Sequence, residues 1–215
     1  MPTPGFPPDT LDGEGIPIWI TQLASDDPNH AVHVVRDLEP ADALEALGAK
    51  PRLFRPCELP GSKPDEWTSL PAAALGAEPG AGATLLAGRI GAWTFVYDDA
   101  GYTVGDDDTT ALSANGRVAA TSMFSINADA SLTYAVDGKE LAWINVDDLD
   151  LEKDLPGMPA ELRAAFEAAG TVEHDYLDPG EPDYDICMRA ICALAGLRCT
   201  VEDLRRIPLL ATPFG

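Results

Sequence analysis

The chain has 215 residues and carries 36 acidic side chains against 14 Lys and Arg, which gives a formal net charge of −22. Nucleic-acid binding needs clustered basic residues that neutralise phosphates, and an anionic membrane surface repels a chain of this sign, so we expect no nucleic acid and no membrane as partner. With 46% hydrophobic residues, the chain has enough apolar material to fold as one domain of moderate size.

The N-terminal part mixes a tail, a strand and a helix. Residues 1–15 are rich in Pro, Gly and acids, a composition that predicts a disordered tail. After an ordered segment of undetermined type, residues 31–36 (AVHVVR) are β-branched, which is typical of a strand. A short helix is predicted to begin at Pro40 and to end before Gly48.

The clearest pattern lies between residues 83 and 146, where apolar and polar residues alternate. The predicted strands are 84–90, 93–97, 117–127, 132–136 and a last one around 141–143. Asp137-Gly138 predicts a tight hairpin turn, because both positions tolerate a positive φ. These strands form an antiparallel meander with one buried face, and we interpret its aromatic stripe as core material: Trp93, Phe95, Tyr97, Tyr134 and Trp143.

The remainder predicts helices over residues 159–169 and 182–195, each followed by Gly. Thr200 to Asp203 resembles a capping box that opens a third, short helix. Strands followed by helices predict an α+β fold, an antiparallel β-meander of five to six strands packed against C-terminal α-helices. The expected division is a tail (1–15) and a single domain (16–215), with its sheet in 31–147 and its helical part in 158–207.

Three acidic clusters fall in predicted loops. The first flanks the loop around Tyr102, the second follows the last strand, and the third links the two longer helices. Carboxylates at turns are accessible to a basic protein, so the candidate partner-binding residues are Asp98, Asp99, Asp106, Asp107, Asp108, Asp147, Asp148, Asp150, Glu173, Asp175, Asp178, Glu181 and Asp183. The alternative interpretation is solvated loop charge that keeps the protein soluble.

No motif points to catalysis or to a bound ion. Counted from Asn145, the sixth and twelfth positions are Asp150 and Pro156, where a calcium-binding EF-hand needs Gly and Glu. The chain has no G-x-S-x-G elbow and no P-loop, and His30 and His33 fit structural or surface roles in a strand. We therefore predict no metal, no cofactor and no catalytic residue.

The cysteines and the N-terminus suggest a compartment. None of the four cysteines forms a C-x-x-C pair, and three lie in one short stretch where Cys behaves as a small buried hydrophobe. The chain shows no signal-peptide pattern and no apolar run near the ~20 residues of a membrane helix. We expect a reducing, cytoplasmic setting.

Four short segments carry a family resemblance: 91–96 (GAWTFV), 125–128 (SINA), 134–138 (YAVDG) and 193–197 (ALAGL). They resemble an uncharacterised, mainly actinobacterial family, domain of unknown function 6461, over most of residues 30–207. The turn after Tyr97 departs from the family pattern, because Asp98-Asp99-Ala100-Gly101 replaces the usual Glu, Asn and Gly. The resemblance implies no activity, so it supplies no catalytic residue.

The leading hypothesis is a soluble, acidic, non-enzymatic domain that binds a basic protein, such as an inhibitor or immunity-type protein. It follows from the charge and from the lack of a catalytic motif. A second hypothesis is a small-molecule binder or enzyme with a pocket between the sheet and the C-terminal helices. A third is an accessory subunit with an exposed apolar patch near Trp67 or Leu209-Leu210.

Overall fold

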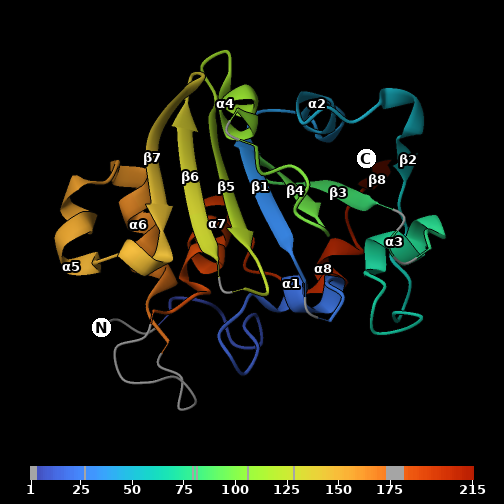
Figure 1. Cartoon of the computed structure of the whole chain (residues 1–215), viewed down its shortest axis with the longest axis horizontal. Helices are drawn as coiled ribbons and strands as arrows, with labels where there is room; N and C mark the ends of the chain where they lie inside the picture. The colour runs from blue at the N-terminus through green and yellow to red at the C-terminus, as the bar shows by residue number, and fades with distance from the viewer. Residues whose placement is uncertain are drawn as a thin grey trace.

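An antiparallel sheet runs through the molecule and carries helices on both faces (Figure 1). The computed structural model describes residues 4–26, 28–78, 80, 82–105, 107–127, 129–172 and 182–215. The strands are β1 (His30–Arg36), β2 (Arg55–Pro56), β3 (Ala83–Ile90), β4 (Trp93–Asp98), β5 (Val118–Phe124), β6 (Ala130–Val136), β7 (Lys139–Asn145) and β8 (Leu209–Phe214).

The strand order is β2-β8-β3-β4-β1-β5-β6-β7, and all neighbours are antiparallel. The α+β class and the antiparallel sheet are confirmed, but five to six strands was too few, because the described residues form eight. The simple meander was also wrong, since β1 lies between β4 and β5. All of β1 except Arg36 is buried, and a strand that is buried on both faces belongs in the middle of a sheet.

The C-terminal strand β8 is an element that the sequence pattern did not predict. It pairs with β3 at six positions, from Ala83 with Phe214 to Gly88 with Leu209. Its short run follows Pro208 and contains Pro213, and prolines argue against a strand when only the sequence is read. Here β8 has just the two-residue β2 on its outer side, so it lies next to the edge of the sheet.

Two groups of helices cover the two faces. Helices α1, α6, α7 and α8 pack on one face and form the larger core, whereas α2 and α4 pack on the other. In Figure 1, α6 and α7 lie behind the sheet, and the front of β5, β6 and β7 below α4 carries no helix. The helices are α1 (Ile18–Leu23), α2 (Pro40–Ala46), α3 (Leu70–Leu75), α4 (Asp108–Ser113), α5 (Leu151–Asp154), α6 (Ala160–Ala169), α7 (Ile186–Ala195) and α8 (Val201–Leu204), with short 3₁₀ turns η1 (Pro51–Leu53), η2 (Val146–Asp148) and η3 (Leu155–Gly157).

Local signals account for the helix ends. The backbone of Gly196 has a left-handed φ of 70°, a conformation that Gly adopts at little cost, and α7 ends there. The Thr200 side chain accepts from the Asp203 amide while Asp203 accepts from the Thr200 amide, so the predicted capping box opens α8. At the N-terminal end, the Gly5 amide donates to the Ala168 carbonyl at 2.8 Å, which places Gly5 against the end of α6.

Aromatic residues fill the space between the sheet and the C-terminal helices. The Trp19 ring lies 5.6 Å from the Phe95 ring and 6.1 Å from the Tyr97 ring, between centroids, and all three side chains are buried. Phe166 of α6 completes this layer. Phe95 and Tyr97 of the β4 aromatic stripe are therefore core, and Trp93 is partly buried against it.

Candidate functional site

The two ends of the sheet differ in how they are protected. Unpaired edge strands invite pairing with other chains, and proteins usually shorten them or place charge or Pro on them. The β2 end is only two residues long and contains Pro56. The β7 end has seven residues, and within it Leu141 to Asn145 includes neither a charge nor a Pro. We call residues 141–145 the β7 edge, and none of the described strands pairs with its outer side.

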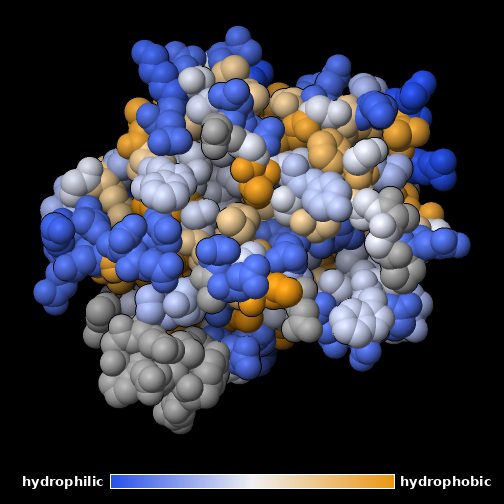
Figure 2. Space-filling model, in the orientation of Figure 1, coloured by the Kyte–Doolittle hydropathy of each residue, from blue (hydrophilic) through white to orange (hydrophobic). Residues whose placement is uncertain are grey.

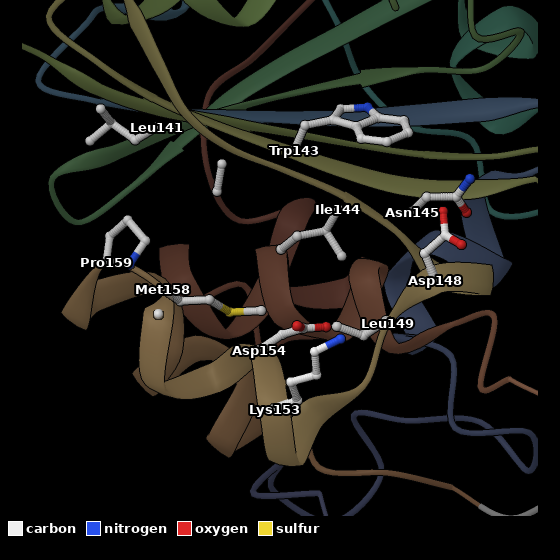
Figure 3. A pocket seen from close by; sticks show the side chains of 12 residues that line it. Leu141, Trp143, Ile144, Asn145, Asp148, Leu149, Lys153, Asp154, Met158 and Pro159 are labelled. Carbon is white, nitrogen blue, oxygen red and sulfur yellow. The ribbon is translucent and has the colours of Figure 1, made fainter.

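A hollow of about 410 Å³ runs along the β7 edge and separates it from the segment that contains α5 and η3. All five residues of the edge line it in succession. Figure 3 shows the Trp143 ring and the Ile144 side chain on opposite sides of β7, with Met158 facing the Ile144 side. The remaining lining residues are Asp148, Leu149, Lys153, Asp154, Gly157 and Pro159.

Two large apolar side chains on β7 are exposed to solvent. Trp143 is 58% exposed and Leu141 is 52% exposed. Leu141 lies at a β-bulge, because Tyr134 pairs with Ala142 and Ala135 pairs with Glu140. We predicted Trp143 as part of the core, and that was wrong, because no helix covers this face where β7 ends the sheet (Figure 1).

Two carboxylates, those of Asp148 and Asp154, line the hollow. Residues 147–154 (DDLDLEKD), which we call the acidic turn, contain five acids and one Lys. The Asp150 side chain accepts from the Lys153 amide at 3.3 Å, and Asp154 accepts from the Asp150 amide at 2.9 Å, so these two acids hold α5 together. Asp147 and Asp148 are exposed. Figure 2 shows hydrophilic side chains gathered over α5.

Asp98 and Asp99 do not lie on an accessible loop. Asp98 is fully buried and accepts hydrogen bonds from the amides of Ala100, Gly101 and Thr103 and from the Thr103 hydroxyl, so it holds the turn after β4. Asp99 accepts from the Ser69 hydroxyl and, at 2.6 Å, from the Thr84 amide. Neither carboxylate is free to contact a partner.

Asp107 and Asp108 lie on the same face of the sheet as Trp143. The Thr109 hydroxyl donates to that of Thr121 at 2.6 Å, which fixes the start of α4 over the middle of β5. Thr121 pairs with a β6 residue that pairs in turn with Trp143, so two strand spacings, about 10 Å, separate Thr121 from Trp143. Asp107 is exposed, whereas Asp108 is half-buried and accepts from the Gly105 amide at 2.7 Å.

Of the candidate partner-binding residues in the third acidic cluster, the structure describes Asp183 alone. Its carboxylate is paired with Arg189, whose guanidinium is fully buried, and it also accepts from the Val172 amide at 2.9 Å. Asp183 therefore acts inside the fold. The other predicted residues fall outside the part of the chain that the structure describes: Asp106, Glu173, Asp175, Asp178 and Glu181.

A chain of hydrogen bonds crosses the buried His33. One ring nitrogen, Nδ1, lies 2.8 Å from the Thr121 hydroxyl, and the other, Nε2, lies 2.8 Å from the Thr103 hydroxyl. Thr103 gives its only hydroxyl proton to Asp98, so it must accept from Nε2–H. Thr109 donates to Thr121, which leaves the Thr121 proton for Nδ1. The network ties the loop after β4 and the first turn of α4 to the sheet.

We predict that His33 is a neutral Nε2–H tautomer at pH 6. Burial lowers the pKa of His33 to about 4, even though the nearby Asp98 acts in the opposite direction. Imidazole nitrogen shifts from NMR with a ¹⁵N-labelled sample report the tautomer directly. Exposed histidines titrate near 6.5, which gives the reference behaviour in the unfolded protein. A charged ring at pH 6, or an Nδ1–H tautomer, would contradict the network.

We predict that Asp99 makes the protein less stable as the pH rises. Burial raises the pKa of Asp99 to about 6, against hydrogen bonds from Ser69 and Thr84 that lower it. Because the folded pKa exceeds the unfolded value near 3.9, this contribution is fully present below pH 3.9 and is lost as the pH rises through about 6, with a magnitude of at most about 3 kcal/mol.

Urea unfolding of wild type and Asp99→Asn between pH 4.5 and 8 measures how Asp99 contributes to the pH dependence of the free energy of unfolding. His30 and His33 have lowered pKa values and act in the opposite direction, because they favour the folded state less as the pH falls from 6.5 to about 4. They are shared by both proteins, so the difference between the two curves isolates Asp99. Parallel curves over the whole range would contradict the assignment.

The remaining chemistry-bearing residues serve the core. All four cysteines are free and buried, and burial raises the pKa of the Cys57 thiol to about 11 and that of Cys199 to about 12. Within the described ranges, no three His, Cys, Asp or Glu side chains come together in a way that could hold a metal ion. Of the helices in the described part of the chain, none has the length and apolar character to cross a bilayer.

These features define an α+β domain with one antiparallel sheet, helices on both faces and an acidic surface beside a free sheet edge. The chain belongs to the family of unknown function DUF6461, whose model matches residues 18–205. No curated protein and no solved structure matches it.

Proposed function

We propose that this protein is a binding domain, without catalytic activity, for a basic protein partner, and that the partner contacts the acidic turn and the β7 edge. The observation that carries the proposal is the exposed Trp143 and Leu141 beside five carboxylates and one lysine. Large exposed apolar side chains with a charged rim are typical of protein interaction sites.

Charge and aromatic surface support the same class of partner. Lys or Arg of a partner could stack on the open Trp143 ring as well as pair with Asp147 or Asp148. The net charge of −22 would accelerate encounter with a basic protein, and the association rate would fall with salt. An inhibitor or immunity-type protein that neutralises a basic partner has these properties.

The test compares capture of partners by two triple variants. The first neutralises the acidic turn with Asp147→Asn, Asp148→Asn and Glu152→Gln, all at exposed positions without a capping role. The matched control removes three exposed acids elsewhere with Glu45→Gln, Glu58→Gln and Glu66→Gln. Each protein is immobilised at 50 mM salt, and proteins captured from the source organism are identified by mass spectrometry and rebound after purification.

We expect a purified basic partner that binds the control triple like wild type and the acidic-turn triple about tenfold more weakly, with a rate that falls steeply up to about 300 mM salt. Equal affinity for the two triples would place the interface elsewhere. A partner whose binding ignores salt would argue against recognition by charge.

A further inference from the structure

On its outer side, β7 has backbone N–H and C=O groups that do not pair with another described strand. In an antiparallel sheet, alternate residues direct both backbone polar groups to one neighbour and the intervening residues direct theirs to the other side. β7 pairs with β6 alone among the described strands. The five residues of the β7 edge span about 17 Å, which is the length of an ordinary strand.

The hollow gives an added strand space and two kinds of side-chain contact. It follows the β7 edge without interruption from Leu141 to Asn145. On one side of the edge lies the exposed Trp143 ring, and on the other lie Ile144 and Met158 (Figure 3). Because side chains of a strand alternate between two faces, an incoming segment would meet the indole with one set of residues and the apolar floor with the other.

The charge around the hollow indicates which kind of segment can bind at the β7 edge. A second copy of this chain would bring its own −22 charge to the edge, and repulsion between like charges opposes that pairing. The carboxylates of Asp148 and Asp154 line the hollow, where Lys153 is the only cation among the lining residues. A segment with Lys or Arg beside its apolar residues is complementary to this lining.

We infer that the β7 edge binds an extended basic segment of a partner protein as an added antiparallel or parallel strand, with backbone hydrogen bonds along Leu141 to Asn145. The choice of a basic segment rests on the proposed function, whereas the strand pairing rests on the geometry of the edge alone. This mode gives affinity through the backbone and specificity through alternate side chains.

The probe is a set of linear 12-residue peptides selected from a random displayed library against the whole protein. We expect the selected peptides to combine β-branched residues with Lys or Arg. Each is then made with N-methyl groups on alternate residues, in the two possible phases. One phase blocks the N–H groups that face β7 and should weaken binding by at least about tenfold, while the other blocks N–H groups that point away from β7 and should change it little.

Protein variants locate the site independently. Trp143→Lys places a positive charge at the edge and should weaken a basic peptide at least about tenfold. Trp67→Lys is the matched control, because Trp67 is 61% exposed in a distant loop, and it should leave binding unchanged. Hydrogen exchange should slow in β7 when the peptide is bound.

The outcomes separate this inference from the proposed function. Basic peptides that bind with equal affinity in both methylated phases, without protection of β7, would overturn strand addition and leave recognition by charge standing. Acidic or neutral peptides that pair with β7 in one phase would overturn the basic partner and keep the strand. A dimer in solution that protects β7 and is broken by Trp143→Lys would show that a second copy is the occupant, and would overturn the inference.

Discussion

Replacing Arg189 with Met is expected to lower the free energy of unfolding by about 3–5 kcal/mol. The Arg189 side chain is fully buried, and its guanidinium donates to the carbonyls of Ala169 and Gly15, each at 3.1 Å, and pairs with Asp183. It therefore joins the N-terminal segment, the end of α6 and the residues before α7. Met fills a similar space but leaves the Asp183 carboxylate, 9% exposed, without its cation.

Urea unfolding at pH 7 measures how much free energy of unfolding Arg189→Met loses. Two comparisons test whether the buried ion pair is the cause. Arg206 forms an exposed pair with Asp203, with side chains 76% and 47% exposed, so Arg206→Met should cost less than about 1 kcal/mol. Adding Asp183→Asn to Arg189→Met should restore part of the stability, because the variant no longer buries an unpaired charge. Equal losses for the two arginines would mean that the buried pair stabilises no more than a surface pair.

Local patterns were sufficient for most elements of the fold. The Asp137-Gly138 turn, the alternation in β5 and β6 and the glycine after α7 depend on a few neighbouring residues, and each is found where the sequence placed it. The central position of β1 could also have been predicted, since Ala or Val residues occur on both of its faces.

Local sequence patterns could not predict which strands pair when they lie far apart in the chain. β8 is a strand because β3 offers it a partner from 121 positions or more earlier in the chain, and nothing in LLATPF itself distinguishes it from a loop. The same reason applies to Trp143. Alternation correctly placed it in a strand, but its exposure depends on β7 being last in the sheet, and strand order is a property of the whole fold.

The acidic residues show why composition could not locate the site. Asp98 and Asp147 each follow a predicted strand and look alike in the sequence, yet Asp98 is buried and accepts four hydrogen bonds, whereas Asp147 is exposed. The difference arises from the loop that carries Thr103 back over the sheet. The uncharged β7 edge beside the acidic turn was the missing signal, and it can be recognised only once β7 is known to end the sheet.

Deleting residues 209–215 is expected to abolish cooperative folding, because β8 contributes to both cores. Leu209 and Ala211 are buried in the larger core, and Leu210 and Phe214 pack on the smaller one. Leu209 also occupies space that a side chain at Gly88 would need, with its Cδ2 2.7 Å from where a Cβ would stand. The loss of these side chains and of six backbone pairs exceeds the 5–15 kcal/mol by which domains of this kind are stable.

Circular dichroism and urea unfolding test whether the truncated chain folds cooperatively. Single substitutions measure how much individual residues contribute to stability. Leu209→Ala should lower the free energy of unfolding by about 2–4 kcal/mol, because Leu209 is 4% exposed and a cavity would open beside Gly88. The neighbouring Pro208 is exposed, so Pro208→Ala should change it by less than about 1 kcal/mol. A truncated chain with a cooperative transition near the wild-type midpoint would show that β3 tolerates being the edge of the sheet and that β8 is dispensable for the fold.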